Sequence, residues 1–289
     1  MVIVFNPVAG RRRAHLLWRV LDVLVANGVR LELAETCRAG HAEALTQEAV
    51  RRGEPMVVAA GGDGTIAEVA NGLMGTGARL GIIPLGTANV LAHELALPFS
   101  PKAVAAALAF GRTTTLWPGV ASSAQGERLF VQMLGVGFDA HVVKNVSFPM
   151  KKLCGKGAYV LRSMAELTRY SYPLIRVRLD EVETQAASII VSKGRLYGGS
   201  FRLAADAVPG EPGFTVVLFD RSGPAAALMY GAALPLNLLG VAPGVRRLRA
   251  NRIDFLGNEP VPAQTDGDAA GCGMISVTNA AAPIQVVVG

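Results

Sequence analysis

The chain has 289 residues, enough for two domains, and its composition of 51% hydrophobic and 17% charged residues excludes an intrinsically disordered protein. Its net charge of +6 favours anionic partners, such as nucleotides or the acidic face of a membrane. We expect no nucleic-acid partner, because the sequence has no arginine-rich tract interleaved with aromatic residues. The N-terminal segment lacks a signal-peptide pattern and the three cysteines are widely spaced, so we expect a cytoplasmic protein.

The first 110 residues alternate between strand and helix patterns. Short apolar runs predict strands, and apolar residues spaced three and four apart predict helices. The expected strands are Val2–Phe5, Leu31–Glu35, Pro55–Ala60 and Leu80–Pro84; the expected helices are one stopped by Gly28, His41–Arg52, Ile66–Met74, one ending at Leu95, and Lys102–Phe110. Because strands and helices alternate, we predict a mostly parallel sheet covered on both faces, a three-layer α/β domain of residues 1–112.

From residue 113 onward the strand pattern dominates. The expected strands are Thr113–Val120, Arg128–Leu134, Leu174–Leu179, Ser188–Ser192, Phe214–Phe219, Arg252–Phe255 and Met274–Val277, and the expected helices are Gly157–Arg169 and Ala225–Leu239. This pattern predicts a second domain of residues 113–282 that is antiparallel, β-rich and sandwich-like. The last apolar run, Ile284–Val288, predicts a strand that fits either domain, so residues 283–289 are a candidate addition to the first.

One uncharged stretch is long enough to cross a bilayer. It runs from Ser222 to Val245, between two arginines. Its composition argues against a membrane-spanning helix, because it contains Pro224, Pro235 and Pro243, with Gly231 and Gly240 and many alanines. We therefore expect a helix that is buried or touches a membrane, in a protein that contacts anionic membrane surfaces peripherally.

The sequence GGDGT at Gly61–Thr65 lies between a buried strand and a helix. Glycines there allow backbone N–H groups to approach phosphate oxygens, and the positive end of the following helix favours an anion at the same place. Asp63 would repel phosphate unless it holds the loop by backbone hydrogen bonds or acts through Mg²⁺. The alternative is a glycine-rich turn without a ligand, since short glycine motifs often occur without one.

Two further turns are expected at the same edge of the sheet. Asn6-Pro7 with Gly10 follows the first strand, and Gly86-Thr87 with Asn89 follows a later one. In open α/β sheets, ligands bind at the carboxyl ends of the strands. The three turns together favour a nucleotide site, although none matches the lysine-containing phosphate loop of P-loop enzymes.

The sequence resembles a known family, the bacterial diacylglycerol kinase and sphingosine kinase-type lipid kinases. The matching stretches occur in the family's order along nearly the whole chain. They are Asn6–Gly10, Thr36 with Gly40–Ala42, Gly61–Thr65 with Glu68, Pro84–Asn89, Gly137–Ala140, Lys151–Leu153 with Ala158-Tyr159, and Asp266–Asp268.

The resemblance implies a lipid kinase that uses ATP and Mg²⁺ in a cleft between a nucleotide domain and a lipid domain. It implies Asp266 as general base and Asp268 as its acidic partner, with Asp63 and Asp268 as candidate ligands of the catalytic Mg²⁺. It implies these residues around the nucleotide: Asn6, Pro7, Gly10, Thr36, Gly61, Gly62, Asp63, Gly64, Thr65, Glu68, Gly86, Thr87 and Asn89. From the residues alone, Asp-Gly is equally a common hairpin turn.

Two departures from the family pattern stand out. The family usually has Asp-Gly-Glu, whereas this chain has Asp268 in the last position, one methylene shorter. Family members also hold a structural Mg²⁺ in an Asp-rich loop, and the corresponding segment 206–213 keeps only Asp206 and Glu211 as acidic residues. We therefore expect this structural site to be unfilled.

Two other functions stay open from the sequence. An NAD kinase shares the GGDGT loop, but its downstream Asn-Glu element is not found, and the Gly86–Asn89 turn favours the lipid kinases. A nucleotide- or lipid-binding protein that has lost catalysis is compatible with the two departures. The acceptor lipid, diacylglycerol-like or sphingoid-like among others, and the oligomeric state are not fixed by the sequence.

Overall fold

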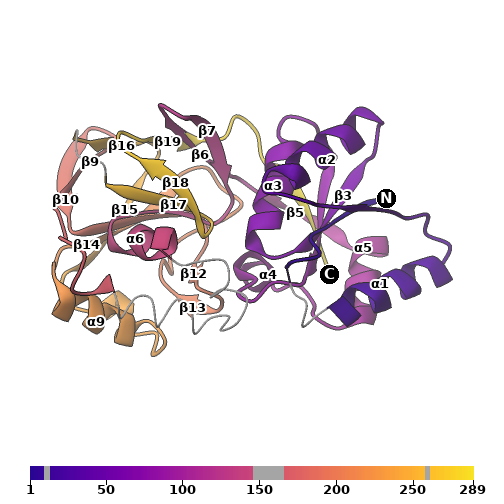
Figure 1. Ribbon diagram of the computed structural model, residues 1–289, viewed down its shortest axis with the longest axis horizontal. Helices are drawn as coiled ribbons and strands as arrows, with labels where there is room; N and C mark the ends of the chain where they lie inside the picture. The colour runs from indigo at the N-terminus through magenta and orange to yellow at the C-terminus, as the bar shows by residue number, and fades with distance from the viewer. Residues whose placement is uncertain (10–13, 146–165, 258–260) are drawn as a thin grey trace. The chain divides into compact units, whose positions relative to one another are not determined.

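The computed structural model describes residues 1–9, 14–145, 166–257 and 261–289. The chain divides into two compact units, which Figure 1 colours along the sequence. The first unit comprises Met1–Pro118 with Ala280–Gly289, and the second comprises Gly119–Asn279. The predicted combination of an α/β domain and an antiparallel β-rich domain is confirmed.

The first unit contains a six-stranded sheet in the order β2-β1-β3-β4-β20-β5. The strands are β1 Val2–Phe5, β2 Glu32–Glu35, β3 Met56–Gly61, β4 Arg79–Pro84, β5 Arg112–Leu116 and β20 Ile284–Val288. All neighbouring pairs are parallel except β20 with β5. Strands β1 and β3 are buried along their whole length, as expected for parallel strands covered on both faces. The C-terminal run therefore joins the first sheet.

Helices cover both faces of this sheet. Figure 1 shows α1 and α5 on one face and α2 and α3 on the other. The bounds are α1 Ala14–Ala26, α2 His41–Arg51, α3 Asp63–Leu73, the short α4 Val90–Glu94 and α5 Pro101–Phe110. Leu17, Val20 and Leu24, which recur at helical spacing in α1, are buried against the apolar side chains of β1 and β3. Burial of this stripe fixes the helix on the sheet.

The second unit contains two six-stranded sheets and a small hairpin. One sheet has the order β10-β9-β16-β19-β6-β7 and the other β15-β14-β11-β8-β17-β18. The strands are β6 Gly119–Ser123, β7 Gly126–Phe130, β8 Met133–Val136, β9 Ile175–Leu179, β10 Val182–Ala186, β11 Ser188–Ser192, β14 Phe214–Phe219, β15 Val245–Ala250, β16 Ile253–Leu256, β17 Pro262–Thr265, β18 Asp268–Cys272 and β19 Ser276–Asn279, with β12 Leu196–Tyr197 paired to β13 Phe201–Arg202. Their inward side chains form one core, in which Phe130 and Phe214 stack.

Among the described residues, three short helical elements accompany the sandwich. They are α6 Phe138–Asn145, α9 Pro224–Ala233 and the 3₁₀ turn η2 Leu239–Val241. Helix α9 and η2 lie against the outer face of the sheet containing β14, where Tyr230 and Leu239 contact a second apolar cluster (Figure 1). Residues 258–260 and most of the expected helix Gly157–Arg169 lie outside the described residues.

Two of the expected strands prove to be wrong as single elements. Thr113–Val120 is divided between β5 and β6, which belong to different sheets, because Pro118 cannot donate a hydrogen bond and the chain passes from one unit to the other there. Arg128–Leu134 is divided between β7 and β8, and the irregular pair Val131-Gln132 separates them. Among the described residues, six strands are not among those expected, namely β10, β12, β13, β15, β17 and β18.

The uncharged stretch that begins at Ser222 forms helix α9, a turn and η2. Within the parts of the chain that the structure describes, no helix is long and apolar enough to cross a membrane.

Candidate active site

The GGDGT segment joins strand β3 to helix α3. Gly62 is the N-cap of α3, and its extended backbone places Asp63 in the first turn. Gly62 has no side chain to bond the first N–H groups of the helix, which an N-cap serine or aspartate would otherwise do. Those donors and the helix dipole point toward whatever lies beyond the loop. The local sequence thus forms an anion-binding helix start.

The loop after β3 lies against the turn after β4. The carbonyl oxygen of Gly61 accepts hydrogen bonds from the amides of Leu85 at 2.9 Å and Gly86 at 3.1 Å. A Cβ added to Gly86 would lie 2.5 Å from the Cα of Gly62, and one added to Gly62 would lie 3.2 Å from the Cα of Gly86. Because only glycines allow so close an approach, the two turns form one backbone-lined surface.

Asp63 has a structural partner in this surface. Its Oδ1 accepts hydrogen bonds from the amides of Val90 at 2.7 Å and Leu91 at 3.4 Å. Burial raises the pKa of the Asp63 carboxyl, and these backbone hydrogen bonds oppose the rise. Of the two roles that the sequence left open, the geometry supports the first, in which Asp63 holds the beginning of helix α4.

The turn after β1 joins the same surface. Asn6 Oδ1 accepts hydrogen bonds from the amides of Val8 at 3.0 Å and Ala9 at 3.2 Å, so Pro7 lies within an Asx turn. Asn6 Nδ2 donates to Thr65 Oγ1 at 3.2 Å, across 59 residues of sequence. The three predicted turns therefore come together, while Gly10 lies outside the described residues.

The other predicted nucleotide residues differ in their placement. Glu68 accepts hydrogen bonds from the amides of Gly40 and Ala42 at 2.9 and 3.0 Å, so it caps helix α2. Thr36 is buried at the end of β2, Thr87 is exposed, and the backbone of Gly64 belongs to the first turn of α3.

Asn89 has an unusual amide group. Its Nδ2 donates to the carbonyl of Gly86 at 2.9 Å, and its backbone has a positive φ of 48°. Asn89 Oδ1 is buried and has no hydrogen-bond partner among the residues that the structure describes. A buried carbonyl oxygen without a donor is costly, so it is suited to accept a hydrogen bond from a bound molecule.

These features fit a nucleotide. The glycine-lined surface and the uncapped start of α3 suit phosphate groups, and Asn89 Oδ1 suits a hydroxyl or amino group of the nucleoside. Over the described residues, no group of three or more His, Cys, Asp or Glu side chains could hold a metal ion by itself. Kinase Mg²⁺ is bound mainly by phosphates with one or two carboxylates, so such a group is not required.

Asp266 and Gly267 form the turn of the β17–β18 hairpin. Both have positive φ, 49° and 87°, as a two-residue type I′ turn requires. The hairpin turn that the sequence left open for Asp-Gly is therefore the geometry observed here, and Asp266 does not lie on an extended strand. Asp-Gly favours this turn because both residues tolerate left-handed backbone.

The Asp266 carboxylate is held by three consecutive amides. Oδ2 accepts from Val131 at 2.8 Å, and Oδ1 accepts from Gln132 at 2.8 Å and Met133 at 2.9 Å. These donors are the irregular pair Val131-Gln132 and the first residue of β8, so one side chain fixes the passage between two sheets. Asp268 is different, because its side chain is 45% exposed and its Oδ2 lies 3.6 Å from Arg128.

A third carboxylate lies close to this turn. Asp139, in the first turn of α6, accepts a hydrogen bond from Gln264 Nε2 at 2.9 Å and another from the Tyr197 hydroxyl. Gln264 Oε1 in turn accepts from the amide of Gly267 at 2.8 Å, so one amide side chain links Asp139 to the Asp-Gly turn. Burial raises the pKa of Asp139, and the two hydrogen bonds oppose the rise.

The sequence pattern singles out Asp139 within Gly137–Ala140 but not its two partners. Nothing local marks Tyr197 and Gln264, which lie 58 and 125 residues away in sequence.

The loop 206–213 is tied to basic side chains. Asp206 Oδ2 lies 3.5 Å from Arg247, and Glu211 contributes its backbone carbonyl to Lys193. The ammonium group of buried Lys193 donates to the carbonyls of Glu211 and Gly213, both at 2.8 Å. Burial lowers the pKa of Lys193 to about 8. A buried cation thus binds the carbonyls of the loop that the family resemblance associates with Mg²⁺.

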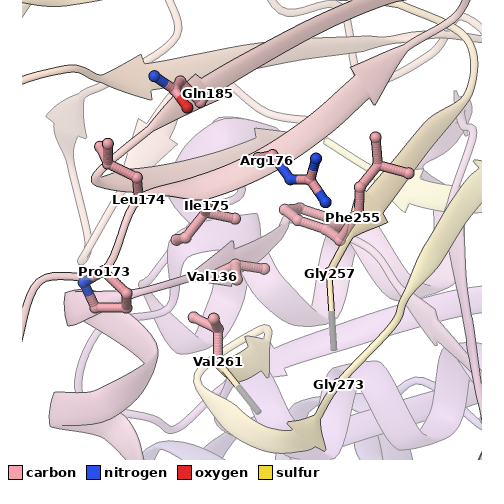
Figure 2. A pocket seen from close by; sticks show the side chains of 11 residues that line it. Val136, Pro173, Leu174, Ile175, Arg176, Gln185, Phe255, Gly257, Val261 and Gly273 are labelled. Atoms are coloured by element: carbon pink, nitrogen blue, oxygen red, sulfur yellow. The ribbon is translucent and has the colours of Figure 1, made fainter. Parts of the chain in front are cut away.

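A pocket of about 460 Å³ opens within the second unit. Figure 2 shows Val136, Ile175 and Val261 around this space, with Arg176 and Gln185 among the polar residues of its wall. Val136 and Ile175 are also members of the core between the two sheets. The pocket is therefore an opening into the sandwich whose wall combines apolar side chains with Arg176 and Gln185.

Comparison with known proteins places the chain among lipid kinases. Residues 1–119 match the diacylglycerol kinase catalytic domain, and residues 132–288 match the YegS C-terminal NAD kinase beta sandwich-like domain. A Pseudomonas putida protein named "Probable lipid kinase YegS-like" is 28% identical over 247 residues, 84% of this chain and 80% of that protein. The diacylglycerol kinase of Bacillus subtilis is 27% identical over 282 residues, 93% and 89% of the two chains.

Solved structures agree on the fold. A Bacillus anthracis structure described as a diacylglycerol kinase matches with a TM-score of 0.72 and 18% identity, over 100% of this chain and 96% of that one. A second one reaches a TM-score of 0.80 at the same identity and coverage.

The second family match alone covers more than half of the 289 residues, and the two matches together run nearly from end to end. In the description of that match, NAD kinase refers to the sandwich fold. The resemblance drawn from the sequence motifs is confirmed. The chain belongs to the family of YegS-like and diacylglycerol lipid kinases, which are phosphotransferases.

Proposed function

We propose that the protein transfers the γ-phosphoryl group of ATP to the hydroxyl of a diacylglycerol-like or sphingoid-like lipid. The observation that carries this proposal is the convergence of three turns at the carboxyl edge of the first sheet. Their glycines and the uncapped start of α3 offer backbone N–H groups to phosphate oxygens. Membership of a lipid kinase family supports the acceptor class.

In this proposal the first unit binds the nucleotide. Gly61, Gly62, Gly64 and Gly86 bring the backbone close to the phosphates, and Thr65 and Asn6 hold the loop by their mutual hydrogen bond. Asn89 Oδ1 accepts a hydrogen bond from the nucleoside. Phosphoryl transfer depends chiefly on such positioning and on neutralising charge.

Magnesium would neutralise phosphate charge when it is bound. Asp268 is the better candidate ligand, because its carboxylate is partly exposed and lies no closer than 3.6 Å to Arg128. Asp63 already uses Oδ1 to hold helix α4, so only its other oxygen is available to a cation. The carboxylates of Asp206 and Glu211 are the candidates for a separate structural Mg²⁺, a site that we expect to be unfilled.

The second unit would supply the acceptor site. We assign Asp266 as the general base, in the position that the family resemblance gives it, with Asp139 as the competing candidate. Asp139 competes because burial raises its pKa and because Gln264 connects it to the same turn. The pocket beside Val136 and Ile175, which also has Arg176 and Gln185 in its wall, would receive part of the lipid.

The test is ATP turnover measured against a panel of lipids, with NAD as an additional acceptor. We expect a phosphorylated lipid and no phosphorylated NAD. Transfer to NAD alone would indicate an NAD kinase, and ATP binding without transfer to any acceptor would indicate a binding protein that has lost catalysis. Gly62→Asp serves as the control, because a negative side chain at the phosphate surface should abolish ATP binding in calorimetry without unfolding the chain.

A further inference from the structure

The segment from α9 to η2 exposes apolar side chains that have no charged neighbours on the same segment. Leu228, Leu236, Leu238 and Val241 are 52%, 66%, 51% and 80% exposed. No charged residue occurs from Ser222 to Val245. Of the ten residues of α9, all of them described, Ala226 alone is buried. We call these four side chains the apolar surface.

This exposure is not a result of poor packing. Tyr230, Leu234 and Leu239 contact the outer face of the sheet that contains β14, and Tyr230 also packs edge-on against Phe219. The segment is therefore anchored by one side and exposed on the other. Helices without charge are ordinarily buried, and proteins in water rarely expose contiguous apolar side chains without a partner for them.

Three arginines lie next to the segment that carries the apolar surface. The amide of Arg202 donates to Asn237 Oδ1 at 3.0 Å, which places β13 beside the turn after α9. The amide of Arg221 lies 3.4 Å from the hydroxyl of Tyr230, just before the helix. A Cβ added to Gly240 would lie 2.8 Å from the guanidinium of Arg247, so that side chain lies against η2. All three arginines are exposed.

We infer that the apolar surface and its arginines form the site at which this protein docks on an anionic membrane. Apolar side chains would enter the boundary between headgroups and acyl chains, and the arginines would contact lipid phosphates. Arg246 pairs with Asp220 and Arg247 lies 3.5 Å from Asp206, which leaves the charges of Arg202, Arg221 and Arg249 to complement an anionic surface. A membrane-docking site is separate from the proposed phosphoryl transfer, and it can be tested by measuring binding alone, without measuring enzymatic turnover.

A second copy of this chain is the main competing partner. In a symmetric dimer the same patch faces itself, which would place the arginines of one copy opposite those of the other. That arrangement is unfavourable for charges of one sign, whereas a membrane surface offers the opposite sign. The charge pattern therefore favours an anionic membrane over a second copy of this chain as the partner of the apolar surface.

The experiment measures binding of the full chain to vesicles by co-sedimentation. Vesicles are made of phosphatidylcholine alone or mixed with phosphatidylglycerol, at low and high salt. The apolar test variant is Leu236→Ser with Leu238→Ser. Its matched control is Val25→Ser with Val182→Ser, two side chains that are 60% and 66% exposed elsewhere. The charge variant is Arg202→Gln with Arg221→Gln, and its control is Arg19→Gln with Arg30→Gln.

We expect wild type and both controls to bind the anionic vesicles, more weakly as salt rises. The leucine pair should weaken binding about ten- to a hundredfold, since each buried leucine contributes substantially to partitioning. The arginine pair should weaken it about tenfold or more and reduce the salt dependence. Melting temperatures should not change, because all these side chains are exposed.

Three results would overturn the inference. The first is wild-type binding by the leucine pair, and the second is equal binding to neutral and anionic vesicles. The third is a wild-type dimer, by light scattering, that the leucine pair converts to a monomer.

Discussion

Replacing Asp266 by asparagine tests the assignment on which the catalytic proposal depends. The wild-type carboxylate accepts three backbone hydrogen bonds, one at Oδ2 from Val131 and two at Oδ1 from Gln132 and Met133. Asparagine has one acceptor oxygen. In its better orientation it keeps the two bonds at Oδ1 and turns an amide N–H₂ toward the N–H of Val131. One amide is then left unpaired, and the two remaining bonds lose the strength that a charged acceptor gives them.

The structure therefore predicts a loss of stability as well as a loss of rate. An unpaired buried amide costs roughly 1–3 kcal/mol and the weakened bonds add to this, so we expect Asp266→Asn to lower the free energy of unfolding by about 2–4 kcal/mol. If Asp266 is the base, kcat should also fall by roughly 10²–10⁴-fold, the usual contribution of general-base catalysis. ATP affinity should change little, because the nucleotide turns belong to the first unit.

Urea denaturation measures the first effect, and initial rates at a temperature where the variant stays folded measure the second. Asp268→Asn is the matched control, because its side chain is 45% exposed and its nearest cation is 3.6 Å away. Its stability should change by less than about 0.5 kcal/mol. A destabilised Asp266→Asn variant with near wild-type turnover would make the motif a structural turn and leave Asp139 as the candidate base. Unchanged stability would contradict the three hydrogen bonds.

Three other substitutions test separate parts of the structure. Gly86→Ala should lower the free energy of unfolding by about 1–3 kcal/mol, and more than Gly62→Ala does. The reason is that a Cβ at residue 86 would lie 2.5 Å from the facing Cα, whereas a Cβ at residue 62 would lie 3.2 Å from it. Urea denaturation and ATP calorimetry measure the two effects. Asp268→Glu should preserve or raise kcat by restoring the family's usual residue, which initial rates with the lipid acceptor measure. Lys193 has a pKa of about 8 in the folded protein against an ordinary value of 10.5, so the unfolded chain binds more protons between these two pH values. The free energy of unfolding should therefore rise by about 2 kcal/mol from about pH 8 to about pH 10, as pH-dependent urea denaturation would measure. The Lys193→Met variant should lack this rise.

The three turns of the proposed nucleotide site can be predicted from the sequence because neighbouring residues define each of them. A buried apolar run predicts the strand, glycine or asparagine predicts the turn, and helical spacing predicts the helix after the turn. Parallel strands then bring their carboxyl ends to one edge without any knowledge of side-chain contacts. The structure accordingly joins Asn6 to Thr65 and brings Gly62 against Gly86.

The structure of the second unit is harder to predict from the sequence because its contacts join residues that are distant in sequence. Asp266 binds amides that lie 133 to 135 residues earlier, and Lys193 binds the carbonyl of Gly213 twenty residues later. Alternation of apolar residues finds strands but not the sheet to which each belongs, so it predicts single elements where the chain changes sheet. The Asp-Gly pair itself indicates a hairpin turn, but not the distant amides that its carboxylate binds.

The two candidate bases differ in a way that bears on the size of the catalytic effect. Three amides hold the Asp266 carboxylate in one orientation. Asp139 has a raised pKa because burial disfavours its charge. Gln264 lies between the two residues, because its Nε2 donates to Asp139 and its Oε1 accepts from the amide of Gly267, which follows Asp266. If Asp266 accepts the lipid proton, the loss in kcat on its replacement should lie near the lower end of the range, at about 10²-fold, because positioning and charge neutralisation carry most of a phosphoryl transfer.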